Sequence, residues 1–206
     1  LTNKRWLFFG TGRYLTADDI GSAGSDVQSM YGFIDEDVVY DRDDLTMRTM
    51  AVTSDLVSGY TVRAFEAKTA LPSGSKGWYV DLPESGERII QDAQVVSTFL
   101  VTASMIPSGN TCNPDGIGYI NALDAFTGTS AGGSYFDLDG DGHTDNSAID
   151  PGLPVGSVNV GIGMPTLPNL VRGLLVVGGT GSGNLRALRT STPRWDRASW
   201  REIRRD

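Results

Sequence analysis

The apolar residues of this chain fall into short runs, each ended by a cluster of Gly, Pro, Ser or Asp. Several runs are rich in β-branched and aromatic residues, which favour strands. Long helical periodicity is absent, and only segments 15–20 and 41–45 could form a helical turn. The sequence therefore predicts an all-β protein with strands at 5–9, 30–34, 47–53, 60–65, 77–82, 88–91, 95–103, 118–122, 135–137, 158–162, 173–177, 185–188 and 200–203.

The spacing of these strands narrows the choice of architecture. Their centres lie about 10–18 residues apart, which is typical of antiparallel sheets in a sandwich, a barrel or a propeller. A hydrophobic strand ending in Gly or Asp recurs at 6–10, 29–35, 119–124 and 174–178. At ~40–45 residues per blade, 206 residues supply about four to five propeller blades, few for a closed ring. We therefore expect antiparallel four-stranded blades from part of a larger β-propeller.

Composition excludes several classes of function. The chain carries 17 Lys plus Arg against 25 Asp plus Glu, a formal net charge of −8, whereas nucleic-acid-binding proteins normally present a basic face. One Cys and one His allow neither an intrachain disulfide nor a Cys/His zinc site. The longest apolar runs, such as 173–178, are far shorter than the ~20 residues that span a bilayer. The chain opens on Leu1 without a signal peptide, so we expect a mature product or an excised piece.

Charge is distributed unevenly along the chain. Residues 186–206 carry seven Arg against three acidic residues, a net charge of +4, so residues 1–185 carry −12. A solvated final strand and tail explain this end of the chain. A docking surface for acidic neighbours is the alternative.

The strongest local motif is FDLDGDGHTD at 136–145. Asp137, Asp139, Asp141 and Asp145 occupy positions 1, 3, 5 and 9 of a calcium-binding loop. Gly142 stands at position 6, where such a loop turns sharply. The alternate Asp side chains converge on one point because the loop winds around the ion. The pattern therefore predicts an inserted EF-hand-like loop that binds Ca²⁺.

Two further residues complete the predicted calcium site. His143 at position 7 contributes its main-chain carbonyl, and Asp150 or a water replaces the bidentate Glu, because position 12 is Ala148. The flanks are strand-like or rich in Pro and Gly, so the loop is expected on a β scaffold. An acidic surface turn without metal is the alternative. Four Asp within nine residues repel one another unless a cation neutralises them, and magnesium tolerates irregular carboxylate cages less well than calcium.

Other segments carry weaker signals. The Gly-rich segment 178–183 fits neither nucleotide-binding fingerprint, so a hairpin turn is expected there rather than a phosphate site. Carboxylate clusters at 18–19, 35–37 and 41–44 could serve glycoside chemistry, but solvated loops explain them more simply. The Trp side chains are expected to fill the core or blade interfaces.

Several longer segments resemble a known family. The C-terminal β-propeller of the PilY family is similar in matching order over nearly the whole chain. The segments that carry this resemblance are FFGTGRYL (8–15), QSMYGFID (28–35), KGWYVDL (76–82), GER (86–88), CNPDG (112–116), NALDAFTG (121–128) and SWREI (199–203).

The resemblance implies a function as well as a fold. Members of the PilY family are type IV pilus biogenesis factors and tip adhesins. It implies that residues 1–206 are the C-terminal part of a β-propeller domain of a larger protein, which passes through the periplasm to the bacterial cell surface and the pilus tip. There it would support pilus assembly, twitching motility and attachment to host or abiotic surfaces. The implied partners are minor pilins and the rest of the same protein, to which Cys112 could be bonded.

The calcium-binding feature of the family carries over onto Asp137, Asp139, Asp141 and Asp145. On this basis we expect a calcium-binding module without catalytic activity. Two alternatives come from other classes: a calcium-dependent carbohydrate-binding module and a quinone-dependent propeller enzyme. The enzyme would need a cofactor cavity with metal-binding acids and stacking Trp side chains, and no motif in the sequence marks one.

Overall fold

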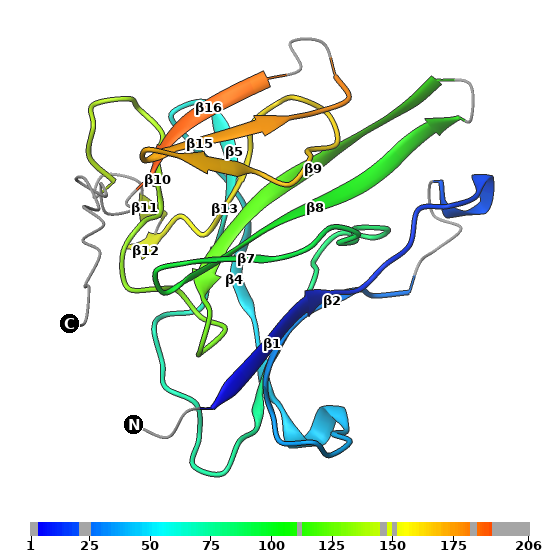
Figure 1. The fold of residues 1–206 in the computed structure, drawn as a ribbon. Coiled ribbons are helices and arrows are strands. Elements are labelled where there is room, and N and C mark those ends of the chain that lie inside the picture. The colour runs from blue at the N-terminus through cyan, green and yellow to red at the C-terminus, as the bar shows by residue number, and fades with distance from the viewer. Residues whose placement is uncertain are drawn as a thin grey trace, which may run out of the picture.

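The computed structural model describes residues 4–20, 26–110, 113–144, 148–149, 152–181 and 185–190 (Figure 1). Cys112, Asp145, Asp150 and the expected strand at 200–203 lie outside these ranges. Short 3-10 turns stand at η1 (Ala17–Asp19) and η3 (Arg42–Asp44). The strands are β1 (Arg5–Gly10), β2 (Ser29–Asp35), β3 (Thr46–Arg48), β4 (Met50–Val57), β5 (Tyr60–Phe65), β6 (Gly77–Asp81), β7 (Gln94–Val96), β8 (Phe99–Asn110), β9 (Asn113–Asp124), β10 (Phe136–Asp137), β11 (Ala148–Ile149), β12 (Leu153–Pro154), β13 (Ser157–Asn159), β14 (Asn169–Val171), β15 (Leu174–Gly178) and β16 (Leu185–Thr190).

These strands form three larger sheets. Sheet A has the order β1-β2-β6-β3, sheet B the order β4-β5-β13-β9-β8-β7, and sheet C the order β10-β16-β15-β14, while β11 pairs with β12. Neighbouring strands run antiparallel except β3, which runs parallel to β6. The all-β prediction is confirmed. Sheet B has six strands and none of the described sheets closes on itself, so the propeller blades stay a prediction.

Most expected strands are present with shifted ends. The segment 47–53 is divided at Thr49 into β3 and β4, and 95–103 is divided into β7 and β8 by a turn in which Ser97 has a φ of 58°. The expected strand at 88–91 is wrong. Its main chain bonds Met105 on one side through Arg88 and Thr11 on the other through Ile89, so it crosses between sheets instead of extending one. The two expected helical turns are η1 and η3.

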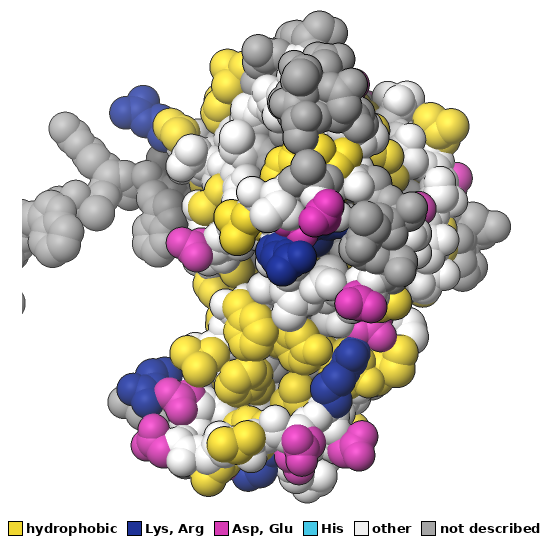
Figure 2. Space-filling view, turned by 90° about the vertical axis from the view of Figure 1, so that its right-hand side faces the viewer, with side chains coloured by type: hydrophobic (Ala, Val, Ile, Leu, Met, Phe, Trp, Pro, Cys, Tyr) yellow, Lys and Arg dark blue, Asp and Glu magenta, His cyan; other side chains and the backbone are white. Residues whose placement is uncertain are grey.

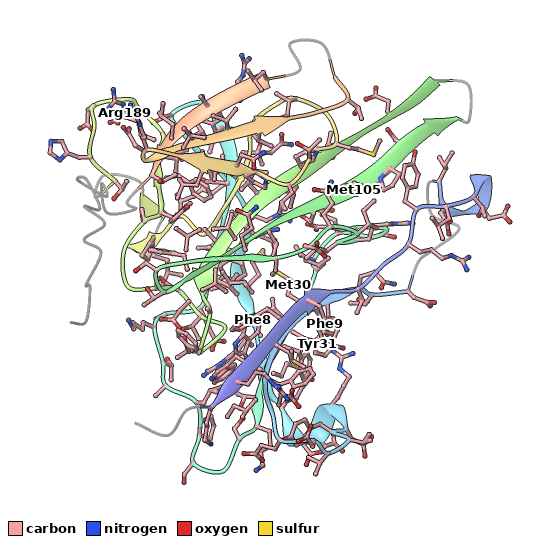
Figure 3. All side chains as sticks on the ribbon, viewed as in Figure 1. Phe8, Phe9, Met30, Tyr31, Met105 and Arg189 are labelled. Carbon is pink, nitrogen blue, oxygen red and sulfur yellow. The ribbon has the colours of Figure 1, made fainter. Side chains whose placement is uncertain are left out.

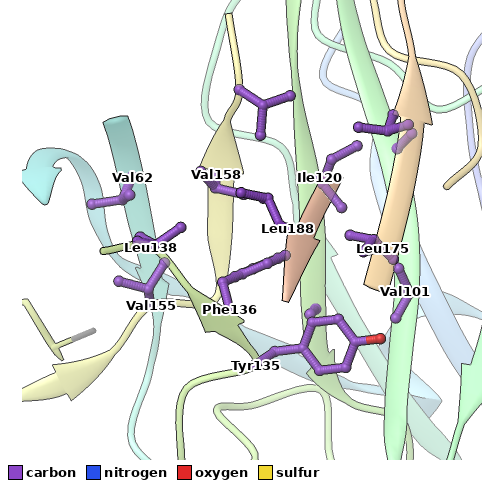
Figure 4. Close-up of a cluster of buried hydrophobic side chains, with 14 of the residues drawn as sticks. Val62, Val101, Ile120, Tyr135, Phe136, Leu138, Val155, Val158, Leu175 and Leu188 are labelled. Carbon is purple, nitrogen blue, oxygen red and sulfur yellow. The ribbon is translucent and has the colours of Figure 1, made fainter. Parts of the chain in front are cut away.

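Sheet B lies between sheets A and C and packs apolar side chains against both. Alternate residues of a strand point to opposite faces, and those of one face pack against sheet C and the segment around β10 (Figure 4). Sheet B contributes Val62, Val101, Ile120 and Val158 to this cluster, and sheet C contributes Phe136, Leu175 and Leu188. Tyr135 and Leu138, next to β10, belong to the same cluster, so the start of the acidic segment is anchored in the core.

The other face of sheet B packs against sheet A around Trp78. This side chain is fully buried, its Nε1 donates to the carbonyl of Ala125 at 2.9 Å, and it lies among Met30, Phe65 and Leu123. A Cβ on Gly32 would lie 2.6 Å from the Trp78 ring, so the close approach of β2 to the indole requires glycine at that position. The expectation that Trp78 fills the core is confirmed. In the described residues, no helix is long and apolar enough to cross a membrane.

Candidate metal centre

The acidic loop begins where β10 leaves the core. In the pairing of β10 with β16, Phe136 stands opposite Thr190, and Asp137 stands opposite Arg189. Figure 3 labels Arg189. Tyr135 and Phe136 are fully buried, and Asp137 is buried as well. The first carboxylate of the loop is therefore held by two anchored neighbours and by a strand pairing.

The carboxylate of Asp137 organises the turn that follows it. Its Oδ1 accepts the main-chain N–H of Gly140 at 2.7 Å, and its Oδ2 accepts that of Gly142 at 3.0 Å. Both glycines have a positive φ, 81° at Gly140 and 94° at Gly142, and a Cβ on either would meet no atom within 4 Å. Backbone conformation, and not lack of space, is therefore the reason for glycine at these positions. The sharp turn expected at Gly142 is confirmed.

The next two carboxylates continue the winding. Asp139 Oδ1 accepts the N–H of Asp141 at 3.2 Å, and Asp141 Oδ1 accepts the N–H of His143 at 2.7 Å. One carboxylate oxygen from each of Asp137, Asp139 and Asp141 lies within 4.8 Å of the other two. The structure therefore brings together three of the predicted ligands, one buried and two exposed.

These distances fit a calcium ion. Ca²⁺ binds oxygen ligands at about 2.3–2.6 Å, so two ligands of one ion lie no more than about 5 Å apart. Three carboxylates and the main-chain carbonyl of the exposed His143 are hard oxygen donors of the kind that calcium takes. The described neighbours of the loop, β10 and β11, are strands. The other two predicted ligands, Asp145 and Asp150, lie outside the described residues.

The remaining carboxylate clusters have structural partners. Asp19 is buried, and its carboxylate accepts Arg13 Nε at 2.8 Å and the N–H groups of Leu15 and Thr16 at 2.9 Å. The bond from Arg13, and then those from the main chain, hold the pKa of Asp19 well below its usual range. The expectation of a solvated loop is wrong for this residue, because it ties η1 to the preceding turn.

The clusters at 35–37 and 41–44 lie mostly at the surface. Asp35 accepts Arg5 Nε at 2.6 Å, and Asp44 accepts the N–H of Asp41 as part of the cap of η3. Lys76 Nζ donates to Glu36 at 2.7 Å and lowers the pKa of that carboxyl. These contacts are those of surface turns. β15 and β16 pair antiparallel with Gly178 opposite Leu185, as the hairpin prediction requires, while residues 182–184 of the connection lie outside the described residues.

A buried polar cluster escaped the sequence analysis. Arg63 and Glu87 are both fully buried, and Arg63 Nη1 donates to the two Glu87 oxygens at 2.8 and 3.0 Å. Ser104 donates to the same carboxylate, and the guanidinium lies 3.4 Å from the centre of the Tyr119 ring. The one signal was a charged residue inside an apolar strand, TVRAF at 61–65. The cluster joins sheet B to the loop before β7. Because Arg63, Glu87 and Ser104 are all buried, it is no site for a ligand.

The chain is thus a stack of β-sheets that carries an acidic loop with three convergent carboxylates. No family model matches the chain. The type IV pilus biogenesis factor PilY1 homolog of Xylella fastidiosa is 33% identical over 215 residues, which cover 99% of this chain and 17% of the relative. PilY1 of Pseudomonas aeruginosa is 24% identical over 170 residues, 71% of this chain and 15% of the relative.

The fold comparison agrees with the sequence comparison. The crystal structure of the Pseudomonas aeruginosa PilY1 C-terminal domain superposes with a TM-score of 0.68 at 22% identity and covers 90% of this chain and 42% of that chain. The chain thus resembles the C-terminal region of the PilY family, as its sequence predicts. It spans about a sixth of the length of the curated relatives it matches, 17% and 15%.

Proposed function

We propose that this chain is a calcium-binding domain of a type IV pilus biogenesis factor. The proposal places it at the pilus tip on the bacterial surface, reached through the periplasm. There it contacts minor pilins and supports pilus assembly, twitching motility and attachment without catalysing a reaction. The relatives named as pilus biogenesis factors support the process, and the convergence of Asp137, Asp139 and Asp141 carries the calcium part.

In this proposal Asp137, Asp139 and Asp141, the carbonyl of His143, Asp145 and Asp150 hold the ion. Calcium supplies positive charge that cancels the mutual repulsion of the carboxylates, and it prefers an irregular oxygen site that magnesium tolerates poorly. The chain itself fixes the first ligand, because Asp137 follows the buried Phe136 and pairs with β16. A filled loop therefore stiffens the end of sheet C, where a minor pilin or another part of the same protein would pack.

Calcium binding is tested first on the 206-residue chain. Extracellular calcium modules have dissociation constants of about 10⁻⁴–10⁻³ M, so we expect weak binding. Calcium at about 100 times Kd adds about 2.7 kcal/mol to the stability if only the folded chain binds. For a chain of this size that raises the melting temperature by about 5–11 °C. Differential scanning calorimetry with calcium or chelator measures the shift.

Two variants decide whether the loop is responsible. Asp139→Ala removes a carboxylate of the loop and should abolish the calcium-dependent shift. Asp43→Ala removes an exposed carboxylate of η3 and should leave it unchanged. Terbium gives an independent reading, because Tyr135 lies two residues from Asp137 and should sensitise its emission. Equal shifts in the parent and in Asp139→Ala would exclude this site.

The function is tested in the bacterium that makes the protein. Replacing Asp139 and Asp141 together by Ala should reduce surface pili and twitching while the protein level stays normal. Pilus counts by electron microscopy and twitching zones on agar measure the effect. Normal pili and twitching in a double variant shown to have lost calcium would contradict a role of the ion in pilus function.

A further inference from the structure

A row of polar side chains crosses the interior between sheets A and B. Ser157 of β13 stands opposite Arg63 of β5 on one side and opposite Asn121 of β9 on the other. Asn121 in turn stands opposite Thr102 of β8. Residues directly opposite one another on adjacent strands point to the same face of the sheet. The Thr102 hydroxyl donates to the sulfur of Met30 in β2, so the face that carries this polar row is the one toward sheet A.

The polar row is as deeply enclosed as the apolar core. All four of its members are fully buried. Figure 2 shows charged side chains spread over one side of the surface among hydrophobic ones, whereas the guanidinium of Arg63 lies inside the protein. The side chains that alternate with the row point toward sheet C and are apolar, among them Val62, Ile120 and Val158. Sheet B therefore has an apolar face toward sheet C and a face with a polar strip toward sheet A.

Two polar atoms in the middle of the row have no hydrogen-bond partner among the described residues. These atoms are Asn121 Oδ1 and Ser157 Oγ, and both are buried. A buried polar atom without a partner costs free energy, so nearly all such atoms in folded proteins are bonded to protein or to an ordered water. Both atoms therefore need a partner that the described side chains and main chain around them do not supply.

The hydrogen bonds of Asn121 determine which way its amide faces. Its Nδ2 donates to Ser104 Oγ at 3.3 Å and to Thr102 Oγ1 at 3.5 Å. Each of these hydroxyls donates its own hydrogen to a side chain of another segment, so both oxygens are left to accept. The amide nitrogen must therefore face β8, and Oδ1 faces the other way, toward Ser157 on β13.

We propose that a water molecule is bound between sheets A and B, where it donates to Asn121 Oδ1 and bonds the hydroxyl of Ser157. The ligand must be a donor, because Oδ1 only accepts. It must also be neutral, because the charges of Arg63 and Glu87 beside it already pair with each other. Ser157 has the smallest side chain of the row, between the longer Arg63 and Asn121, so a ligand as small as water suits this position. An internal water bonds about three polar groups, and Arg63 Nη2, which makes no hydrogen bond within the described chain, supplies a further donor.

The bound water would give β13 an additional link to its neighbour. The main-chain pairing of β13 with β9 covers two residue pairs, Ser157 with Asn121 and Val158 with Ile120. The water adds a bridge between the side chains of the first pair. It is enclosed as the sheets come together, so the layer stays closed to larger ligands from solvent. The inference does not depend on the pilus function or on calcium.

The structure and the solution behaviour of the 206-residue chain test the site. In a high-resolution crystal structure we expect a peak of water density within hydrogen-bond distance of both Asn121 Oδ1 and Ser157 Oγ. In solution, a water held inside the protein gives nuclear Overhauser effects with the sign of a slowly tumbling molecule. We expect such an effect on the main-chain amide of Ser157 and not on that of the exposed Leu56. A direct hydrogen bond between the two side chains, with no density between them, would overturn the proposal.

A matched pair of variants assigns the signal to this site. Asn121→Leu replaces the amide by an apolar group of similar shape, so the density and the effect on the Ser157 amide should both be lost. Asn169→Leu makes the same change at an exposed position of β14 and should leave both as in the parent. Undiminished density in Asn121→Leu, or contacts in the parent short enough for a metal ion, would contradict a water at this place. If Asn121→Leu does not fold, the density in the parent decides.

Discussion

Removing Glu87 should be among the most damaging single changes to this fold. The substitution Glu87→Leu takes the carboxylate from a guanidinium that is fully buried and leaves Ser104 without its acceptor. Breaking a buried ion pair from one side costs about 3–5 kcal/mol. Glu84 keeps a carboxylate oxygen 3.5 Å from Arg63 Nη2, so we expect the lower half of that range. At about 2–4 °C per kcal/mol, the melting temperature falls by about 6–16 °C.

The assay is thermal and urea unfolding of the 206-residue chain. Glu36→Gln, which loosens the exposed pair with Lys76, is the matched control and should cost less than about 1 kcal/mol. The triple variant Arg63→Met, Glu87→Leu and Ser104→Ala removes the buried charges together and should recover most of the lost stability. The reasoning is refuted if Glu87→Leu costs no more than Glu36→Gln, or if the triple variant is less stable than Glu87→Leu alone.

Two smaller changes test other contacts. Gly32→Ala should cost about 1–3 kcal/mol by overpacking, because its Cβ would lie 2.6 Å from the Trp78 ring, whereas a Cβ on Gly133 meets nothing within 4 Å and Gly133→Ala should be nearly neutral in the same urea titration. Asp19→Asn should lower the melting temperature at pH 7. The pKa of Asp19 is depressed by its bond from Arg13, so its contribution is present above the unfolded value of about 3.9 and is lost as the pH falls further. The difference in melting temperature between the parent and Asp19→Asn should therefore be large at pH 7 and smaller at pH 3. An equal difference at both pH values would contradict this role of the Asp19 carboxylate.

The strand pattern of this chain could be predicted because short apolar runs ended by turn residues are a local property. What the sequence did not reveal depends on contacts between distant segments. β3 ends at Arg48, whose side chain turns inward to the carbonyls of Thr127, Thr69 and Ala70. The short β3 then runs parallel to β6, and the residues around β3 do not predict this pairing. The short strands β11, β12 and β14 were not expected, since two or three residues carry no period.

The acidic loop was predictable for the same reason that most strands were. All its features lie within nine residues: the alternating Asp, the glycine with positive φ and the hydrogen bonds that wind the chain. The buried polar cluster was not predictable in this way, because its members are distant in the sequence. Arg63 and Glu87 are 24 residues apart, and Glu87 and Ser104 are 17 residues apart. The outer face of sheet A was equally hidden. Phe9, Tyr31 and Tyr79 are visible in the sequence, but only their register across three strands makes them one surface.

The position of β13 determines when this domain can finish folding. This short strand joins the two halves of sheet B, with β5 on one side and β9 on the other. Roughly 90 residues separate β5 from β13, so at about 5–20 residues per second the ribosome needs about 5–18 s to supply it. Until β13 is made, β5 keeps an unpaired edge, and so does β9 once it has been made; such edges are the surfaces on which unfinished chains associate wrongly. Nascent chains therefore depend on residues made late, because the two halves of sheet B cannot join before β13 is present.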